Sequence, residues 1–251
     1  MLHIVATPIG NLADMTPRAR DTFTSADVIA CEDTRRTWAL LSAYHIARPQ
    51  MISYREGKEE AAGQQVLKAL LAGKDVALCS DGGYPGISDP GYRLIQLAID
   101  AGVEFDVIPG ACAVNLALIY SGLPTSSFTF KGFPPRKDGA LRRFFEEERD
   151  MPHTLVIYES PFRVWHTLKM ALAVLGDRKA AVCIEMTKQY ERVSRDFLSN
   201  LATAFCAKKI KGEVAIVIAG NNPKFVNPAA PTGDDKCGAD VPEDETDDTE
   251  A

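Results

Sequence analysis

The chain has 251 residues, of which 46% are apolar and 25% are charged; these proportions indicate an ordinary soluble protein with one large domain or two smaller ones. No apolar run approaches the roughly 20 residues that a membrane-spanning helix needs, and the N-terminal segment lacks the basic start and long apolar core of a secretion signal. The net charge of −6 does not exclude an anionic partner, because the acidic residues are unevenly distributed.

The acidic charge is concentrated near the C-terminal end. Residues 229–251 contain nine acids and one base, and so carry −8, which leaves +2 for residues 1–228. A segment this charged, with almost no large apolar residues, is expected to be disordered. We therefore predict an acidic tail over residues 225–251, which serves either to solubilise the protein or to bind a partner.

Cysteine and histidine usage points away from a metalloprotein. The six cysteines form no C-x-x-C pair, and the four histidines show no ligand spacing such as H-x-x-x-H, so no metal site is expected. Cys31, Cys79 and Cys183 lie in apolar strand-like runs, where buried structural thiols are typical. This usage fits a reducing, cytoplasmic environment.

Apolar runs alternate with helical patterns along almost the whole chain. The expected strands, in chain order, cover residues 2–6, 28–31, 76–79, 105–108, 128–131, 154–158, 181–185 and 214–219. The expected helices cover residues 17–25, 34–44, 59–71, 90–101, 112–120, 140–149, 162–175 and 196–208. This alternation predicts an α/β fold with mostly parallel strands.

The first two expected strands are each followed by a loop of special composition. ATPIGN, residues 6–11, contains a glycine that would let a nucleotide approach, although a simple tight turn explains it equally well. EDTRR, residues 32–36, places acids and bases at a helix start. Glu32 or Asp33 could cap that helix, or Arg35 could hold a phosphate at the mouth of a cleft.

The most informative loop is SDGGYPGISDPG, residues 80–91, which holds four glycines, two prolines and two aspartates between a strand and a helix. Open parallel sheets bind ligands at the carboxyl ends of their strands, in loops of this kind. IPG, residues 108–110, also ends a strand, so the three loops predict one composite pocket, unless they are unrelated turns. None of them matches G-x-G-x-x-G, G-x-x-x-x-G-K-[ST] or G-x-S-x-G, which argues against a dinucleotide enzyme, a nucleotide hydrolase and a serine hydrolase.

The alternation of strand and helix patterns is interrupted at SGLPTSSF, residues 121–128. We predict a division there into residues 1–121 and 122–224, with a ligand cleft between the two halves. Beyond it, KGFPPRKDGALRR, residues 131–143, combines basic residues with an aromatic, as nucleic-acid contacts do, although a solvated basic loop is the alternative. Three further motifs pair an acid with a base beside an expected strand: YESPFR, EMTK and KGE, which begin at residues 158, 185 and 211.

Together these motifs resemble a known family. ATPIGN, EDTRR, SDGGYPGISDPGYRL, IPG, SGLPT, GFPPRK, YESPFR, EMTK and KGE, in this order between residues 2 and 220, are similar to the motifs of the ribosomal RNA small-subunit methyltransferase I family. That family belongs to the tetrapyrrole-methylase superfamily of S-adenosylmethionine-dependent enzymes. The resemblance implies two α/β subdomains of the tetrapyrrole-methylase type with a ligand cleft between them.

The resemblance also implies an activity and its partners. These are a homodimer, S-adenosylmethionine in the cleft, and methylation of the 2′-hydroxyl of a cytidine in the decoding region of 16S ribosomal RNA. A superfamily enzyme acting on another RNA site or on a small molecule is one alternative, and a non-catalytic cofactor-binding module is another. By position, the implied cofactor contacts are Pro8, Ile9, Gly10, Asp81, Gly82, Gly83, Tyr84, Cys112, Ala113, Tyr158, Met186 and Glu213.

Methyl transfer to a ribose hydroxyl needs alignment of the reactants and removal of a proton. We take Glu159 and Glu185 as candidates for a base or orienting group, and Arg35 and Lys188 as candidate cationic partners. The chain departs from the family at three places that bear on the site: Gly83-Tyr84 replaces a small residue and a threonine, Ala111-Cys112-Ala113 replaces Pro-Ser-Ala, and Phe162 replaces histidine.

Overall fold

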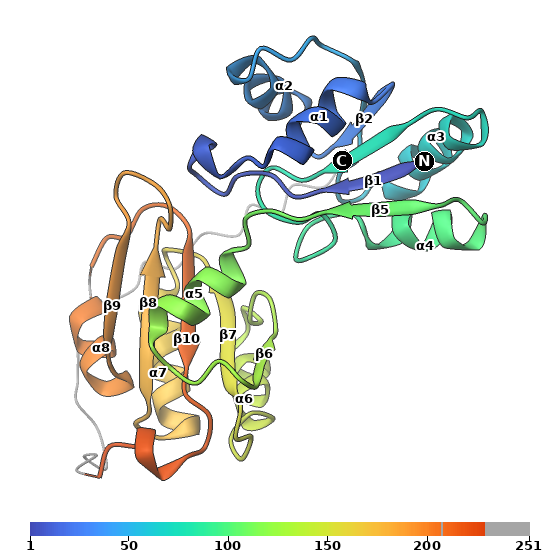
Figure 1. Ribbon diagram of the computed structural model, residues 1–251. Helices are drawn as coiled ribbons and strands as arrows, with labels where there is room; N and C mark the ends of the chain where they lie inside the picture. The colour runs from blue at the N-terminus through green and yellow to red at the C-terminus, as the bar shows by residue number, and fades with distance from the viewer. Residues whose placement is uncertain (207, 229–251) are drawn as a thin grey trace, which may run out of the picture.

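The computed structural model describes residues 1–206 and 208–228, so most of the predicted acidic tail lies outside the described residues. The chain builds two lobes, each a five-stranded sheet with helices on both faces, from consecutive parts of the sequence (Figure 1). Figure 1 shows the first lobe, in blue to green, beside the second, in green to red. A single described stretch after residue 108 leads from one sheet to the other.

The sheet of the first lobe is entirely parallel, in the order β3-β2-β4-β1-β5. Its strands are β1 (Leu2–Val5), β2 (Val28–Cys31), β3 (Gln50–Ser53), β4 (Val76–Cys79) and β5 (Phe105–Ile108). Alternate residues face opposite sides: Leu2 and Ile4 pack toward α3 (Glu59–Leu71) and α4 (Tyr92–Asp100), while Val5 packs toward α1 (Pro17–Ser25) and α2 (Thr34–Ala43). Since the strands are parallel, their carboxyl ends lie at one edge of the sheet.

Sequence signals explain where these helices start. Thr16 caps α1, because its hydroxyl accepts a hydrogen bond of 3.2 Å from the Ala19 amide, and Pro17 occupies the first turn. Asp33 caps α2 in the same way, with its carboxylate 2.8 Å from the Arg35 amide nitrogen. The capping role considered for Asp33 is therefore confirmed.

The sheet of the second lobe is mixed, in the order β6-β7-β10-β8-β9, and only the β6–β7 pair is parallel. Its strands are β6 (Phe128–Phe130), β7 (Thr154–Glu159), β8 (Lys179–Ile184), β9 (Arg192–Phe197) and β10 (Val214–Ile218). One face packs against α6 (Asp138–Glu146), α7 (Val164–Leu175) and α8 (Leu198–Phe205), and the other against α5 (Ala113–Ser121). Two short 3-10 helices, Leu12–Asp14 and Pro223–Phe225, complete the described secondary structure.

The α/β fold class with two subdomains is confirmed, with two differences of detail. The strands were expected to be mostly parallel, which holds for the first sheet and is wrong for the second. The predicted division at residue 121 groups α5 with the first half, whereas the apolar side of α5, including Val114 and Leu118, packs into the core of the second sheet. The three cysteines predicted to be buried, Cys31, Cys79 and Cys183, are buried. Over the described part of the chain, we find no helix with the length and apolar character to cross a membrane.

Candidate functional site

A cavity of about 790 Å³ opens where the two lobes meet, which is within the usual range of small-molecule sites. The first lobe contributes the loops at the carboxyl ends of β1, β2 and β4. All twelve residues predicted to contact the cofactor line this cavity. Of the four predicted catalytic residues, Glu159 and Lys188 line it, whereas Arg35 and Glu185 do not.

Strand register explains why motifs far apart in the sequence meet here. In the second sheet Val214 pairs with both Glu159 and Ile184, so β7 and β8 end where β10 begins. The YESPFR and EMTK motifs, which follow β7 and β8, and the KGE motif, which precedes β10, therefore lie at the same end of these strands. In the first sheet Val5 pairs with Ile108, and Cys31 pairs with Cys79, which aligns the four loops that follow.

The three loops predicted to form a composite pocket are joined by hydrogen bonds. Thr7 and Gly83 exchange two backbone bonds of 2.9 and 3.0 Å, which tie the first loop to the long loop. The Gly110 amide donates to the Tyr84 hydroxyl at 3.0 Å, which ties the third loop to the same place. Gly83 has a φ of +82°, a conformation that glycine adopts without strain. These hydrogen bonds therefore join the three loops into one unit of the first lobe.

The EMTK turn, which follows β8, contacts that unit from the second lobe. The stem of Lys188 occupies the space beside Gly10, where an added Cβ would clash with Cγ of the lysine. The Lys188 ammonium donates to Glu185 at 2.7 Å and to Glu213 at 2.9 Å. Glu185 and Thr187 both have a positive φ, 53° and 65°, which is strained for residues other than glycine and is typical of functional sites.

The YESPFR motif ties a neighbouring loop to the end of β7 through an ion pair and hydrogen bonds. The Glu159 side chain is buried and accepts hydrogen bonds from the Ser160 amide and the Thr167 hydroxyl. The Arg163 guanidinium lies 3.5 Å from the same carboxylate and donates to the carbonyls of Pro134 and Pro135 at 3.2 and 2.7 Å. Arg163 thereby fastens the loop that precedes α6 to the end of β7.

Arg35 lies at the surface rather than in the cavity. Its guanidinium folds back onto Asp33 at 2.7 Å, and the arginine side chain is 90% exposed. This hydrogen-bonded arginine holds the pKa of the Asp33 carboxyl well below its usual range. Its neighbour Arg36 lines the cavity and lies 3.1 Å from Asp81. Arg36 is a site residue that the sequence reasoning missed, although it belongs to the same motif.

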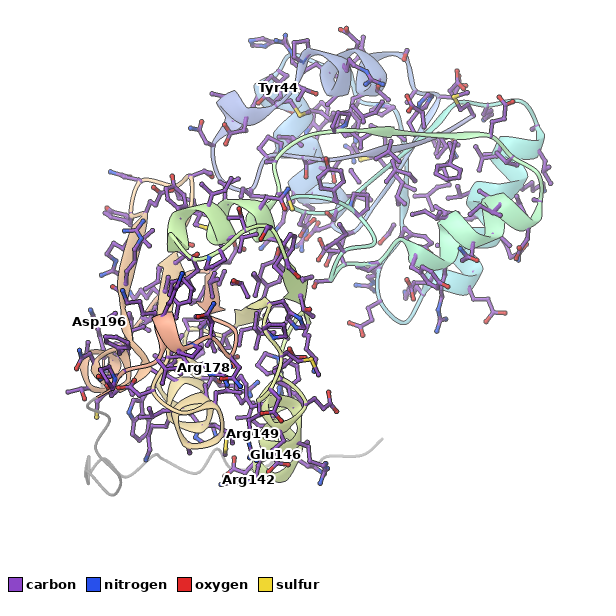
Figure 2. The ribbon with its side chains drawn as sticks, turned by 60° about the horizontal axis from the view of Figure 1, so that its bottom comes forward. Tyr44, Arg142, Glu146, Arg149, Arg178 and Asp196 are labelled. Carbon is purple, nitrogen blue, oxygen red and sulfur yellow. The ribbon has the colours of Figure 1, made fainter. Side chains whose placement is uncertain are left out.

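The basic segment 131–143 divides into parts with different surroundings. Lys131 is engaged with Glu147 and Glu148 at 2.7 and 3.2 Å and is largely buried. Phe133 lines the cavity and is 60% exposed, with its ring centroid 5.6 Å from that of Tyr158. Figure 2 shows Arg142 near Glu146 and Arg149, on the side of the second lobe away from the first. Only the beginning of the segment is thus placed beside the cavity.

The cavity is lined by five acidic side chains, and three of them are paired. Asp81 lies 3.1 Å from Arg36, Glu159 lies 3.5 Å from Arg163, and Glu213 lies 2.9 Å from Lys188. The other two are Glu32 and Asp89, which have no basic group within 4.0 Å among the residues that the structure describes. The sequence reasoning did not select either as a site residue.

Comparison with known proteins agrees with this architecture. The family described as tetrapyrrole (corrin/porphyrin) methylases matches residues 1–202. Ribosomal RNA small subunit methyltransferase I of Halalkalibacterium halodurans is 45% identical over 223 residues, which cover 89% of this chain and 77% of the relative. The protein of the same name from Thermotoga maritima is 41% identical over 219 residues, which cover 87% of this chain and 98% of the relative.

Among solved structures, uroporphyrin-III C-methyltransferase of Thermus thermophilus, in complex with S-adenosylhomocysteine, shares the fold. Its TM-score is 0.59 at 21% identity, and the match covers 87% of this chain and 96% of that one. The fold, the motifs around the cavity and these relatives lead to one conclusion: the chain belongs to the tetrapyrrole methylase family of S-adenosylmethionine-dependent methyltransferases and, within it, to the ribosomal RNA small subunit methyltransferase I family.

Proposed function

We propose that this protein transfers the methyl group of S-adenosylmethionine to the 2′-hydroxyl of a cytidine in the decoding region of 16S ribosomal RNA. The observation that carries the proposal is one cavity to which both lobes contribute motif residues. Its carboxylates suit a cofactor that carries a positive sulfur and an ammonium group. The names of the curated relatives, at 41–45% identity, support ribosomal RNA as the substrate.

The chemistry demands little covalent help from the protein. The methyl group is already activated by the positive sulfur, so the enzyme has to align oxygen, carbon and sulfur, with the reacting atoms about 3–3.5 Å apart. It must also accept the hydroxyl proton as the new bond forms. Binding of the cofactor by loops of both lobes would provide that alignment.

The predicted catalytic residues are proposed here with distinct roles. Lys188 and Glu185 support the first loop and Glu213, and Glu159 positions Arg163 and the loop before α6. Arg35, exposed beside the cavity, is proposed to contact an RNA phosphate. Lys188→Ala should therefore weaken cofactor binding in calorimetry, while Arg35→Ala should weaken RNA binding and reduce its salt dependence. Wild-type affinities in either variant would remove that residue's role.

RNA contact is proposed for the surface beside Phe133. Phe162 is 92% exposed at the start of the following motif, and Arg136 and Lys137 are exposed in the loop between β6 and α6. Bases stack on exposed aromatic rings and phosphates pair with nearby cations, so this surface suits a single-stranded segment of RNA.

The homodimer and the cytoplasmic location are proposed together with the function. β5 is an edge strand of the first sheet, and Phe105 and Val107 are exposed on it, which leaves apolar surface for a second copy to cover. Light scattering should give about twice the chain mass of 27.3 kDa. A monomer mass at working concentrations would reject the dimer without affecting the proposed activity.

The activity is tested by mapping the methylated nucleotide. Small ribosomal subunits from a strain that lacks this methyltransferase are incubated with the protein and radiolabelled S-adenosylmethionine. We expect label on one cytidine, at a linkage that has become resistant to alkaline hydrolysis, because a 2′-O-methyl group blocks that cleavage. Label on a base or on another nucleotide would contradict the assigned site, and absence of label despite cofactor binding would contradict the assigned substrate.

A further inference from the structure

Asp89 differs from the other acidic residues of the cavity because no basic group among the described residues neutralises its charge. Asp81, Glu159 and Glu213 are each paired with a basic side chain. Burial raises the pKa of Glu32, and the charge of Arg36 opposes part of that rise, so Glu32 has a cation acting on it. Asp89 is half-buried, and the groups that act on it include no base. It is therefore the carboxylate of the cavity that is available to take up a positive charge.

The charged groups facing Asp89 come from four elements. Glu32 follows β2, Asp81 lies in the same loop and Glu213 precedes β10; these carboxylates act together with burial, which is the larger effect, to raise the pKa of Asp89 from 3.8 to about 6. A hydrogen bond with Ser80 opposes that rise. On β7, Tyr158 has a raised pKa, mainly through burial and in part through the Asp89 charge. Asp89 thus remains ionised at neutral pH but holds a proton more readily than an ordinary aspartate.

The backbone around Asp89 is held in place. Ser88, directly before it, has a φ of +64°, a strained conformation that persists only where the surroundings enforce it. The Ser88 hydroxyl lies close to Gly132 of the second lobe, 3.4 Å from where a Cβ would be. Asp89 therefore directly follows the residue at which the long loop of the first lobe meets the loop before α6, and it lines the same cavity as Phe133.

We propose that Asp89 is the catalytic residue that accepts the proton of the acceptor hydroxyl. This inference depends on the proposed ribose methylation. In the transfer, the oxygen–carbon bond forms as the carbon–sulfur bond breaks, and sulfur keeps the electron pair and becomes a neutral thioether. The hydroxyl proton passes to the Asp89 carboxylate, so charge and atoms balance without a further reactant. A positioned base of this kind contributes about 10²–10⁴-fold to a rate.

The test is the single-turnover rate of methylation at subsaturating and at saturating S-adenosylmethionine, measured from pH 5 to 8.5. In the wild type at subsaturating cofactor, where the profile reports the free protein, the rate should fall on the acid side with an apparent pKa near 6, as a required base becomes protonated. At saturating cofactor this fall should move to lower pH, because the bound sulfonium favours the carboxylate. Asp89→Asn should lower the rate by about 10²–10⁴-fold and abolish that acid limb. Asp89→Glu should restore part of the rate, and with it the fall in rate on the acid side of the pH profile. The matched control, Asp100→Asn at the exposed end of α4, should behave as the wild type.

Each contrary outcome has a defined meaning. An Asp89→Asn variant that keeps both the rate and the acid limb would overturn the assignment. A variant with weakened cofactor affinity by calorimetry, but with the wild-type maximal rate, would also overturn it and identify Asp89 as a cofactor anchor. Wild-type protein that methylates no ribose would reject the proposed function, and the base assignment with it.

A melting experiment tests the environment of Asp89 without using activity. A carboxyl whose pKa is raised by folding destabilises the protein as pH rises from the unfolded value of 3.8 toward the folded value of about 6. Asp89→Asn should therefore gain melting temperature relative to the wild type at pH 7.5, and gain less at pH 5. An equal difference at both pH values would overturn the inference, since Asp89 would then titrate as an ordinary exposed acid.

Discussion

Gly91→Ala is expected to lower the rate of methyl transfer by at least about 10²-fold, by deforming the loop that carries Asp81, Gly82, Gly83 and Tyr84. A Cβ at Gly91 would lie 2.6 Å from the Gly86 amide nitrogen and 3.0 Å from the Pro85 carbonyl carbon. Both are backbone atoms of the same loop, so no side chain can turn away to make room. Displacement of reacting groups by about 1 Å can cost about 10² in rate, and we expect a loss of at least this size, with a matching loss of cofactor affinity in calorimetry.

The chain offers a matched control at Gly139. This glycine lies in α6, and an added Cβ would meet nothing within 4 Å. Gly139→Ala should leave activity unchanged and stabilise the protein by about 0.5–1 kcal/mol, since alanine favours the helix more than glycine does. Wild-type cofactor affinity in Gly91→Ala would show that the loop tolerates a side chain there, and would contradict this account of the loop.

Arg163→Ala is expected to produce the largest loss of stability. It removes the cation that faces the fully buried carboxylate of Glu159, and it leaves the carbonyls of Pro134 and Pro135 without this donor. Breaking a buried ion pair by removing one partner costs about 3–5 kcal/mol. In a domain of this size that corresponds to a fall in melting temperature of about 6–20 °C, measurable by calorimetry or circular dichroism.

A surface pair and a double variant provide the comparison for Arg163. Arg18, exposed on α1, lies 3.0 Å from Asp106, and Arg18→Ala should cost no more than about 1 kcal/mol, as exposed pairs usually do. Adding Glu159→Gln to Arg163→Ala should recover part of the lost stability, because the isolated buried charge is then removed. A melting temperature in Arg163→Ala equal to that of Arg18→Ala would contradict the proposed burial cost.

Strand and helix patterns predicted most of the fold because buried strands have a strong local signature. The fully buried runs Val28–Cys31 and Val76–Cys79 are strands with the predicted bounds, and so is the apolar run Phe105–Ile108, although it forms an edge strand that is partly exposed. Two strands were missed, β3 and β9, and both lie at sheet edges. Gln50–Ser53 has one buried residue and Arg192–Phe197 has none, so neither shows the apolar run that marks an interior strand.

The antiparallel pairing of most strands in the second sheet could not be predicted from the sequence pattern either. Strand–helix alternation favours parallel pairing, and β6, α6 and β7 follow that rule. The segment from β8 to β10 departs from it, because β9 pairs antiparallel with β8, and β10 then enters between β7 and β8. That choice depends on contacts between distant segments, which a local pattern does not contain.

The sequence by itself determined the two-lobed α/β class, the family, and the loops that line the cavity, because glycines, prolines and charges at strand ends are local signals. Only the tertiary structure decided which charges are free. Glu159 and Arg163 hold each other and a loop, Lys188 is shared by two glutamates, and Asp89 has no basic partner within 4.0 Å among the described residues. The physical reason is that the charge state and reactivity of a side chain depend on burial and on neighbours brought from other elements, and these are set by packing.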